Sequence, residues 1–148
     1  MILEDKRTRS LATDENPEFP AETRGIPIFL PLPPRPLWPN ARPHWAVKSR
    51  ATKSYRTRAK VEAILAMHAA KIGRVPRWPR ASVTITYFYP DNRQRPDRDN
   101  ALAALKAAFD GLADAQVVCD DADFIYQPIK FGETLKTGPF VHLLIEPC

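Results

Sequence analysis

The sequence predicts an α/β (α+β) fold in which two main helices pack on one mixed β-sheet. The 148 residues are 44% hydrophobic, which is enough to enclose one core. Apolar side chains recur with a period of two in some segments and at helical spacing in others, and the two kinds alternate along the chain. We therefore expect one domain over residues 25–148. Residues 1–24 mix acids, bases and prolines without periodicity, which predicts a flexible extension.

Four segments have strand character. Residues 26–30 form a short apolar run that suits a sheet edge, and residues 81–89 alternate β-branched or aromatic residues with polar ones. Residues 124–131 and 140–146 supply two further strands near the end of the chain. Pro128 indicates an edge strand or a bulge, because proline cannot donate a backbone hydrogen bond. The segment between residues 31 and 40 is rich in proline and is expected to be extended.

Two segments have helix character. The first spans residues 61–72 and ends at Gly73, with a stripe of residues that is expected to be buried. This stripe comprises Val61, Ile64, Leu65, His68, Ala69 and Ile72. The second helix is expected to run from Asn100, as its N-cap, to about Ala115. Its buried side comprises Leu102, Leu105, Phe109 and Leu112. Gln116 follows at a position where a glycine with positive φ is expected.

Several classes of protein are disfavoured by composition. Cys119 and Cys148 are too far apart for a Cys-x-x-Cys motif, so we expect a buried Cys119 and a terminal free thiol at Cys148. The apolar run Val141–Ile145 is much too short to cross a bilayer. The first ten residues lack the apolar core of a secretory signal. The expectation is a soluble, cytoplasmic protein with no membrane partner and no small-molecule cofactor.

Positive and negative charges are separated along the chain, although the net charge is only +5. Residues 35–80 contain twelve Lys or Arg residues and one acid, whereas residues 91–123 contain eight aspartates. We expect residues 41–58 to form a basic loop or hairpin that faces DNA phosphates, although a solvated surface remains an alternative. The DNA-binding candidates are Arg42, Lys48, Arg50, Lys53, Arg56 and Arg58. Trp45 and Tyr55 either stack on bases or anchor this loop to the core.

Carboxylates form the candidate catalytic site. Asp97 and Asp99 point the same way if their segment is extended, and like charges so close favour a bound cation over a simple helix cap. A second acidic group at residues 120–123 can complete a three-carboxylate Mg²⁺ site, or it can be a solvated turn. Lys106 lies two helical turns after Asp99, where it can stabilise phosphate charge or protonate the leaving group. Alternatively it forms an ordinary ion pair with Asp110.

These motifs together resemble the RusA-like Holliday junction resolvases, a family of crossover junction endodeoxyribonucleases. The resemblance rests on Pro96-Asp97-x-Asp99-Asn100, on Lys106 before Phe109-Asp110-Gly111-Leu112, and on Asp120-Asp121, and it extends over about residues 26–145. It implies a homodimer of DNA recombination and repair that resolves four-way junctions by paired nicks with Mg²⁺, with Mn²⁺ as an alternative ion. The implied metal ligands are Asp97, Asp99 and Asp121, with Lys106 as a further catalytic residue. Asp120 and Asn100 are expected to support these ligands.

Two other interpretations stay open. The chain can be a non-catalytic nucleic-acid binding protein, in which the acids only cap helices and turns. It can also be an adaptor whose proline-rich segment, residues 31–39, binds a partner. Within the nuclease interpretation, the natural substrate can be a Holliday junction, a replication fork or a phage packaging intermediate.

Overall fold

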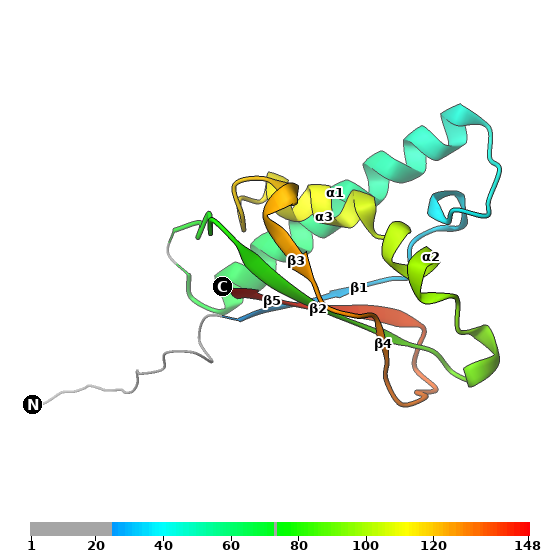
Figure 1. The fold of residues 1–148 in the computed structure, drawn as a ribbon. Helices are drawn as coiled ribbons and strands as arrows, with labels where there is room; N and C mark the ends of the chain where they lie inside the picture. The colour runs from blue at the N-terminus through cyan, green and yellow to red at the C-terminus, as the bar shows by residue number, and fades with distance from the viewer. Residues whose placement is uncertain (1–24, 73) are drawn as a thin grey trace, which may run out of the picture.

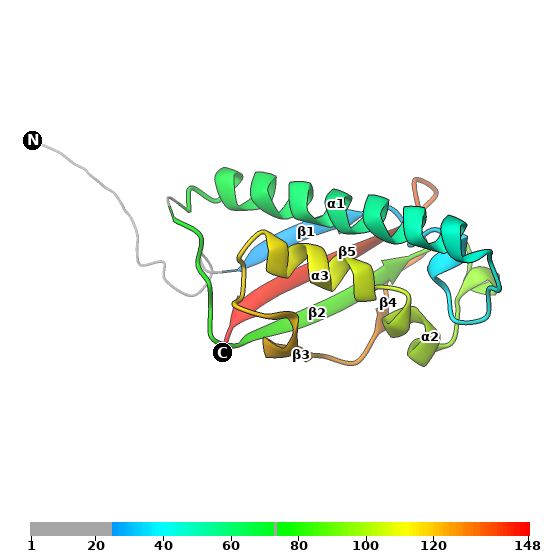
Figure 2. The same ribbon diagram turned by 90° about the horizontal axis from the view of Figure 1, so that it is seen from above.

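The helices all lie on one face of a five-stranded mixed sheet, which gives two layers (Figures 1 and 2). The computed structural model describes residues 25–72 and 74–148. The predicted extension over residues 1–24 and the predicted helix end at Gly73 lie outside this part of the chain. The expected α+β class, with a mixed sheet and two main helices, is confirmed. In the part of the chain that is described, no helix is both long and apolar enough to cross a membrane.

The central strands of the sheet are β2 (Ala81–Phe88) and β5 (Phe140–Pro147), and β1 (Ile26–Leu30) lies at one edge. The contacts of β5 with β1 and with β2 are antiparallel. The opposite edge consists of β3 (Phe124–Tyr126) and β4 (Lys130–Phe131), both parallel to β2. The single strand predicted over residues 124–131 is therefore interrupted around Pro128, because a proline has no N–H for the ladder.

Residues that alternate along the three longest strands form the core. Side chains at alternate positions of β1, β2 and β5 point toward the helices and are buried, as the alternation of residues 81–89 predicted for β2. The largest of these side chains are Ile26, Ile28, Leu30, Val83, Ile85, Tyr87, Leu143 and Ile145. The Tyr87 hydroxyl donates a hydrogen bond of 2.7 Å to the carbonyl oxygen of Ala101, so its one polar group is satisfied inside the core.

The longest helix, α1 (Trp45–Ala69), occupies most of the segment that was expected to be a basic loop. That expectation is wrong: helix begins directly after His44, whose Nδ1 accepts a hydrogen bond from the Ala46 N–H at 3.1 Å. The buried side of α1 comprises Tyr55, Ala59, Ala63 and Met67. Two of these four residues are alanines. The apolar pattern of this face is therefore weak, and the many charged residues around it obscure it.

The apolar stripe predicted for residues 61–72 mostly faces outward. Val61, Ile64 and Leu65 are 45%, 46% and 57% exposed, and His68 is also exposed. The prediction that these residues are buried is wrong, and His68 is not a core histidine. Ile72 alone is partly buried against the core. The reason is that α1 turns its small residues toward α3, and this rotation leaves the larger aliphatic residues at the surface.

The proline-rich segment after β1 was expected to be extended, but it is not extended throughout. A short 3-10 helix, η2 (Arg35–Leu37), interrupts it, and the Trp38 indole N–H donates to the Pro33 carbonyl oxygen at 2.8 Å. Pro33 itself is buried. The segment therefore folds back on the domain. Prolines have no backbone N–H to donate, and the Trp38 side chain supplies a donor for the Pro33 carbonyl oxygen instead.

The second predicted helix is divided into α2 (Arg98–Ala103) and α3 (Lys106–Asp114). Asp97, rather than Asn100, occupies the N-cap position, so Asn100 lies inside the first turns of α2. The interruption follows from a tighter turn, in which the Leu105 N–H bonds to the Leu102 carbonyl oxygen at 3.1 Å. As predicted, Leu105, Phe109 and Leu112 are buried and Leu102 is partly buried.

Both cysteines are exposed and neither is in a disulfide. The prediction that Cys119 is buried is wrong. Val117 and Val118 occupy the buried positions of this segment, and Trp78 pairs with Val118 in a parallel bridge. Cys119 comes one residue later, at the start of the acidic turn, where the chain has left the core.

Gly111 allows α3 to contact the backbone of α1. A Cβ atom at this position would overlap the carbonyl oxygen of Arg56 and would lie 3.1 Å from the Cβ of Ala59. We expect Gly111→Ala to lower the free energy of unfolding by about 2–3 kcal/mol, because the helices must move apart. Denaturant titration measures this loss. Ala113→Gly on the same helix is the control, with an expected loss of only about 1 kcal/mol.

Gln116 has a φ of 66°, which confirms that a left-handed residue ends α3. The N–H groups of Gln116 and Val117 bond to the carbonyl oxygens of Ala113 and Leu112, which completes a Schellman motif. We expect Gln116→Gly to raise the free energy of unfolding by about 1 kcal/mol, since glycine adopts this conformation without a Cβ clash. Gln116→Ala should change it little. Equal stability of the two variants would contradict this explanation.

Candidate functional site

Lys106 lies between two carboxylates that come from different segments of the chain. Its Nζ donates to Asp110 Oδ1 at 2.7 Å and to Asp121 Oδ2 at 2.5 Å. Lys106 and Asp110 are one turn apart on α3, whereas Asp121 begins a short 3-10 turn, η4 (Asp121–Asp123). Hydrogen bonds to the two carboxylates raise the pKa of Lys106 above its usual value, so its ammonium stays charged at neutral pH.

The three acids of the η4 segment have different roles. The Asp120 side chain accepts from the Ala122 N–H at 3.2 Å, and Asp123 Oδ2 accepts from the Asp120 N–H at 3.1 Å. These two residues therefore form a capping box, as the turn interpretation requires. Asp121 instead reaches Lys106, and the hydrogen bond from Lys106 is the main reason that its pKa falls to about 2. Asp121 is therefore the one acid of this turn whose partner lies on α3.

Asp97 and Asp99 lie at the start of α2 and are exposed. The expectation that both carboxylates project from one side of an extended segment is wrong, because the helix already begins at Arg98. Residues two apart on a helix do not face each other. The Asp97 carboxylate also accepts no capping hydrogen bond from the first turn of α2. Helix capping by this side chain therefore does not account for Asp97.

Tyr126, on β3, is near acids of two different segments, α2 and the η4 turn. It lines a cavity of about 300 Å³ together with Asp99. It is also close to the other group: burial raises the pKa of its hydroxyl, and the negative charge of Asp121 raises it further. Its ring packs on Phe109 of α3, with 4.7 Å between the ring centroids. Tyr126 is therefore close both to Asp99 at the start of α2 and to Asp121 of the η4 turn.

A divalent cation is compatible with the chemical type of these side chains, because Mg²⁺ prefers carboxylate oxygens. Over residues 25–72 and 74–148, however, no three His, Cys, Asp or Glu side chains are grouped closely enough to hold a metal ion. Asp97, Asp99 and Asp121 are thus not brought together as a trio. A cation held by all three requires the start of α2 and the η4 turn to approach each other.

Exposed cations extend from residue 42 along α1. Arg56 is bound to Asp114 of α3 by two hydrogen bonds of 2.6 and 2.8 Å, and Arg58 pairs with Glu62 at 2.9 Å. Four DNA-binding candidates form no ion pair with any described acid, and these are Arg42, Lys48, Arg50 and Lys53. Over the described residues, the charges of these four side chains are therefore not neutralised by a carboxylate.

The two aromatic residues among these cations differ in exposure. Trp45 is 76% exposed at the start of α1, where stacking on a base remains open to it. Tyr55 is buried, and its hydroxyl donates to the Pro31 carbonyl oxygen at 2.7 Å. For Tyr55 the anchoring interpretation is the correct one.

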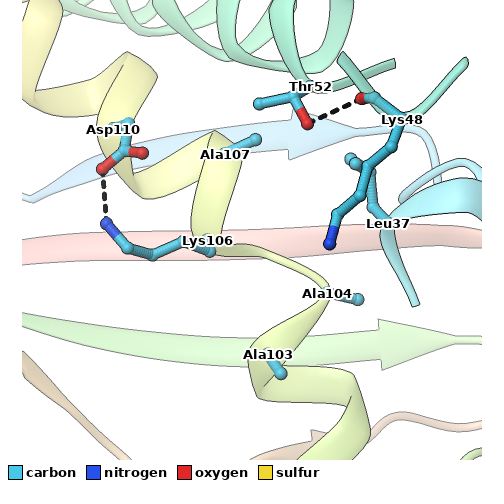
Figure 3. A pocket seen from close by; sticks show the side chains of 8 residues that line it. All are labelled: Leu37, Lys48, Thr52, Ala103, Ala104, Lys106, Ala107 and Asp110. Atoms are coloured by element: carbon cyan, nitrogen blue, oxygen red, sulfur yellow. Dashed lines mark hydrogen bonds and ion pairs between the residues drawn. The ribbon is translucent and has the colours of Figure 1, made fainter. Parts of the chain in front are cut away.

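A cavity of about 270 Å³ lies between α1, here called the basic helix, and α3 (Figure 3). The α3 side belongs to the acidic cluster, which is the group of Asp110 and Asp121 bound to Lys106. Lys48 and Thr52 of α1 line it from one side, and Lys106 and Asp110 of α3 line it from the other. Sequence reasoning treated Asp110 only as an alternative partner of Lys106, although its i+4 spacing was the available signal. The structure adds Asp110 to the site residues, since it fixes Lys106 beside this cavity.

The Lys106–Asp121 ion pair predicts a pH dependence of stability. The pKa of Asp121 is lowered from 3.8 to about 2 in the folded chain. Between these two pKa values the unfolded chain binds more protons than the folded chain. The contribution of the pair to stability is therefore fully present above about pH 4 and is lost as the pH falls to 2. Denaturant titrations should therefore show Asp121→Asn less stable than the parent at pH 6. The difference should disappear near pH 2, and a pH-independent difference would contradict it.

Comparison with known proteins gives one clear relationship. No family model matches the chain. A protein of Xylella fastidiosa (strain Temecula1 / ATCC 700964), described as an uncharacterized protein, is 40% identical to it over 115 residues. The match includes 77% of this chain and 72% of the Xylella protein. At this identity and coverage, the chain belongs to the same family as that Xylella fastidiosa protein.

Proposed function

We propose that this protein is a RusA-like, Mg²⁺-dependent endodeoxyribonuclease that resolves Holliday junctions or other branched DNA by paired nicks. Asp97, Asp99 and Asp121 would hold the ion, and Lys106 would act on the phosphate. The observation that carries the proposal is the cavity shared by Lys48 of the basic helix and by Lys106 and Asp110 of the acidic cluster. A nuclease must bind a phosphodiester next to its catalytic groups, and Lys106, which lines this cavity, also contacts the proposed metal ligand Asp121.

The chemistry of the chain's own residues is consistent with phosphoryl transfer. The Lys106 ammonium, held by Asp110, can offset the charge that develops on the phosphate oxygens. Its raised pKa favours this electrostatic role over proton donation to the leaving oxygen. A bound divalent ion would supply an activated water and further charge neutralisation. Asn100 and Asp120 would support the ligands from α2 and from the η4 turn.

A homodimer is part of this proposal. A four-way junction has two symmetry-related strands to cut, so paired nicks require two active sites. A two-fold axis between identical subunits supplies them with the same geometry.

The proposal is tested with a synthetic four-way junction and a linear duplex, each with and without Mg²⁺. We expect Mg²⁺-dependent nicking of the junction. Asp121→Asn and Asp97→Asn should keep junction binding and lose about 100-fold or more in nicking rate. Asp123→Asn is the matched control from the same turn, and it should keep most of the activity because Asp123 only caps. Normal cleavage by the Asp97 and Asp121 variants would refute the site assignment.

A second candidate is a non-catalytic protein that binds nucleic acid. Two observations favour it: Asp121 is already neutralised by Lys106, and no metal-binding trio occurs among the described side chains. This candidate predicts junction binding with a steep salt dependence and no cleavage in Mg²⁺ or Mn²⁺.

A further inference from the structure

The cavity in Figure 3 has an apolar floor that the chemistry of the acidic cluster does not explain. Three alanines from the α2–α3 junction form this floor, together with Leu37 of η2. The alanines are Ala103, Ala104 and Ala107, and the latter two are buried. Small side chains at the interruption between two helices leave space that a larger residue would fill.

Polar groups line the cavity from both helices, and those of α1 are Lys48 and Thr52. In Figure 3, the Lys48 side chain extends from α1 toward Ala104, whereas Lys106 turns toward Asp110. Lys48 forms no ion pair with a described acid, so its ammonium is the cation available to a ligand here. The Thr52 hydroxyl donates to the Lys48 carbonyl oxygen at 2.8 Å, and its oxygen can still accept a hydrogen bond.

This combination matches the chemistry of one nucleotide. A nucleotide carries a phosphate that pairs with a lysine, a flat base that can lie on an apolar floor, and N–H groups that a hydroxyl can accept. A volume of about 270 Å³ lies just below the ~300–1,000 Å³ range of ligand pockets, so the cavity has room for no more than one such unit. A base that stays paired and stacked cannot enter a pocket of this kind.

We propose that this cavity binds a single unpaired nucleotide of the DNA substrate, with its phosphate at Lys48 and its base over Ala103, Ala104 and Ala107. The inference rests on the proposed function, which it deepens by naming the feature of branched DNA that is recognised. Lys106 and Asp110 line the same cavity, so the bound nucleotide would lie beside the acidic cluster.

The test is a binding measurement without divalent cations, by fluorescence anisotropy, on a duplex with a two-nucleotide bulge and on the same duplex fully paired. We expect the parent to prefer the bulged DNA. Ala103→Trp fills the cavity from an exposed position without changing charge, and it should weaken binding to bulged DNA about 10-fold while sparing the paired duplex. Circular dichroism and a thermal melt check that the variant is folded.

A matched pair of lysine variants tests the phosphate contact. Lys48→Ala should weaken binding to bulged DNA more than to paired DNA, whereas Lys53→Ala, on the same helix but outside the cavity, should weaken both equally. Equal binding of the two DNAs by the parent would overturn the proposal. So would an Ala103→Trp variant that keeps the preference for bulged DNA.

Failure of this proposal and failure of the nuclease proposal give different results. An Ala103→Trp variant could nick a junction in Mg²⁺ and keep the parent's DNA preference. This result would refute the nucleotide-binding proposal and leave the nuclease proposal standing. A preference for bulged DNA that Ala103→Trp abolishes, in a parent chain that never nicks, would keep the pocket and remove the nuclease.

Discussion

Helices α1 and α3 contact each other where Gly111 has no side chain, and the position of the basic residues follows from this contact. The approach turns Ala59 and Ala63 of α1 inward. It therefore leaves the cationic side of α1 exposed next to the start of α3, where Lys106 lies. The two hydrogen bonds between Arg56 and Asp114 join the same two helices at the surface. Gly111, which belongs to the Phe109-Asp110-Gly111-Leu112 motif, is thus explained by the packing of these two helices.

Strands and helices were not equally predictable from the sequence. The strands β1, β2 and β5 were predicted almost to the residue, β2 from its period of two and β1 from a short apolar run. The inward face of α1 was missed because alanines bury little apolar area and give a weak signal. The exposed residues Val61, Ile64 and Leu65 gave a stronger signal, which led to the wrong face.

The candidate site was predictable in residue type more than in geometry. The chemistry of phosphodiesters selects carboxylates and a lysine, and the structure does place Lys106 against Asp121, fifteen residues away. The predicted arrangement of Asp97 and Asp99 was wrong, since α2 begins three residues earlier than predicted, and this changes which way each side chain points. The interruption at Leu105 and the contact of Lys106 with two acids depend on tertiary packing, which local spacing does not encode.

Backbone contact between two helices leaves almost no freedom for one to slide along the other. The separation between the cations of α1 and the acids near α3 is consequently fixed by the fold. Loops elsewhere, such as residues 132–139 between β4 and β5, can vary in length without altering this separation. A ligand that spans both groups must conform to the protein, rather than the reverse.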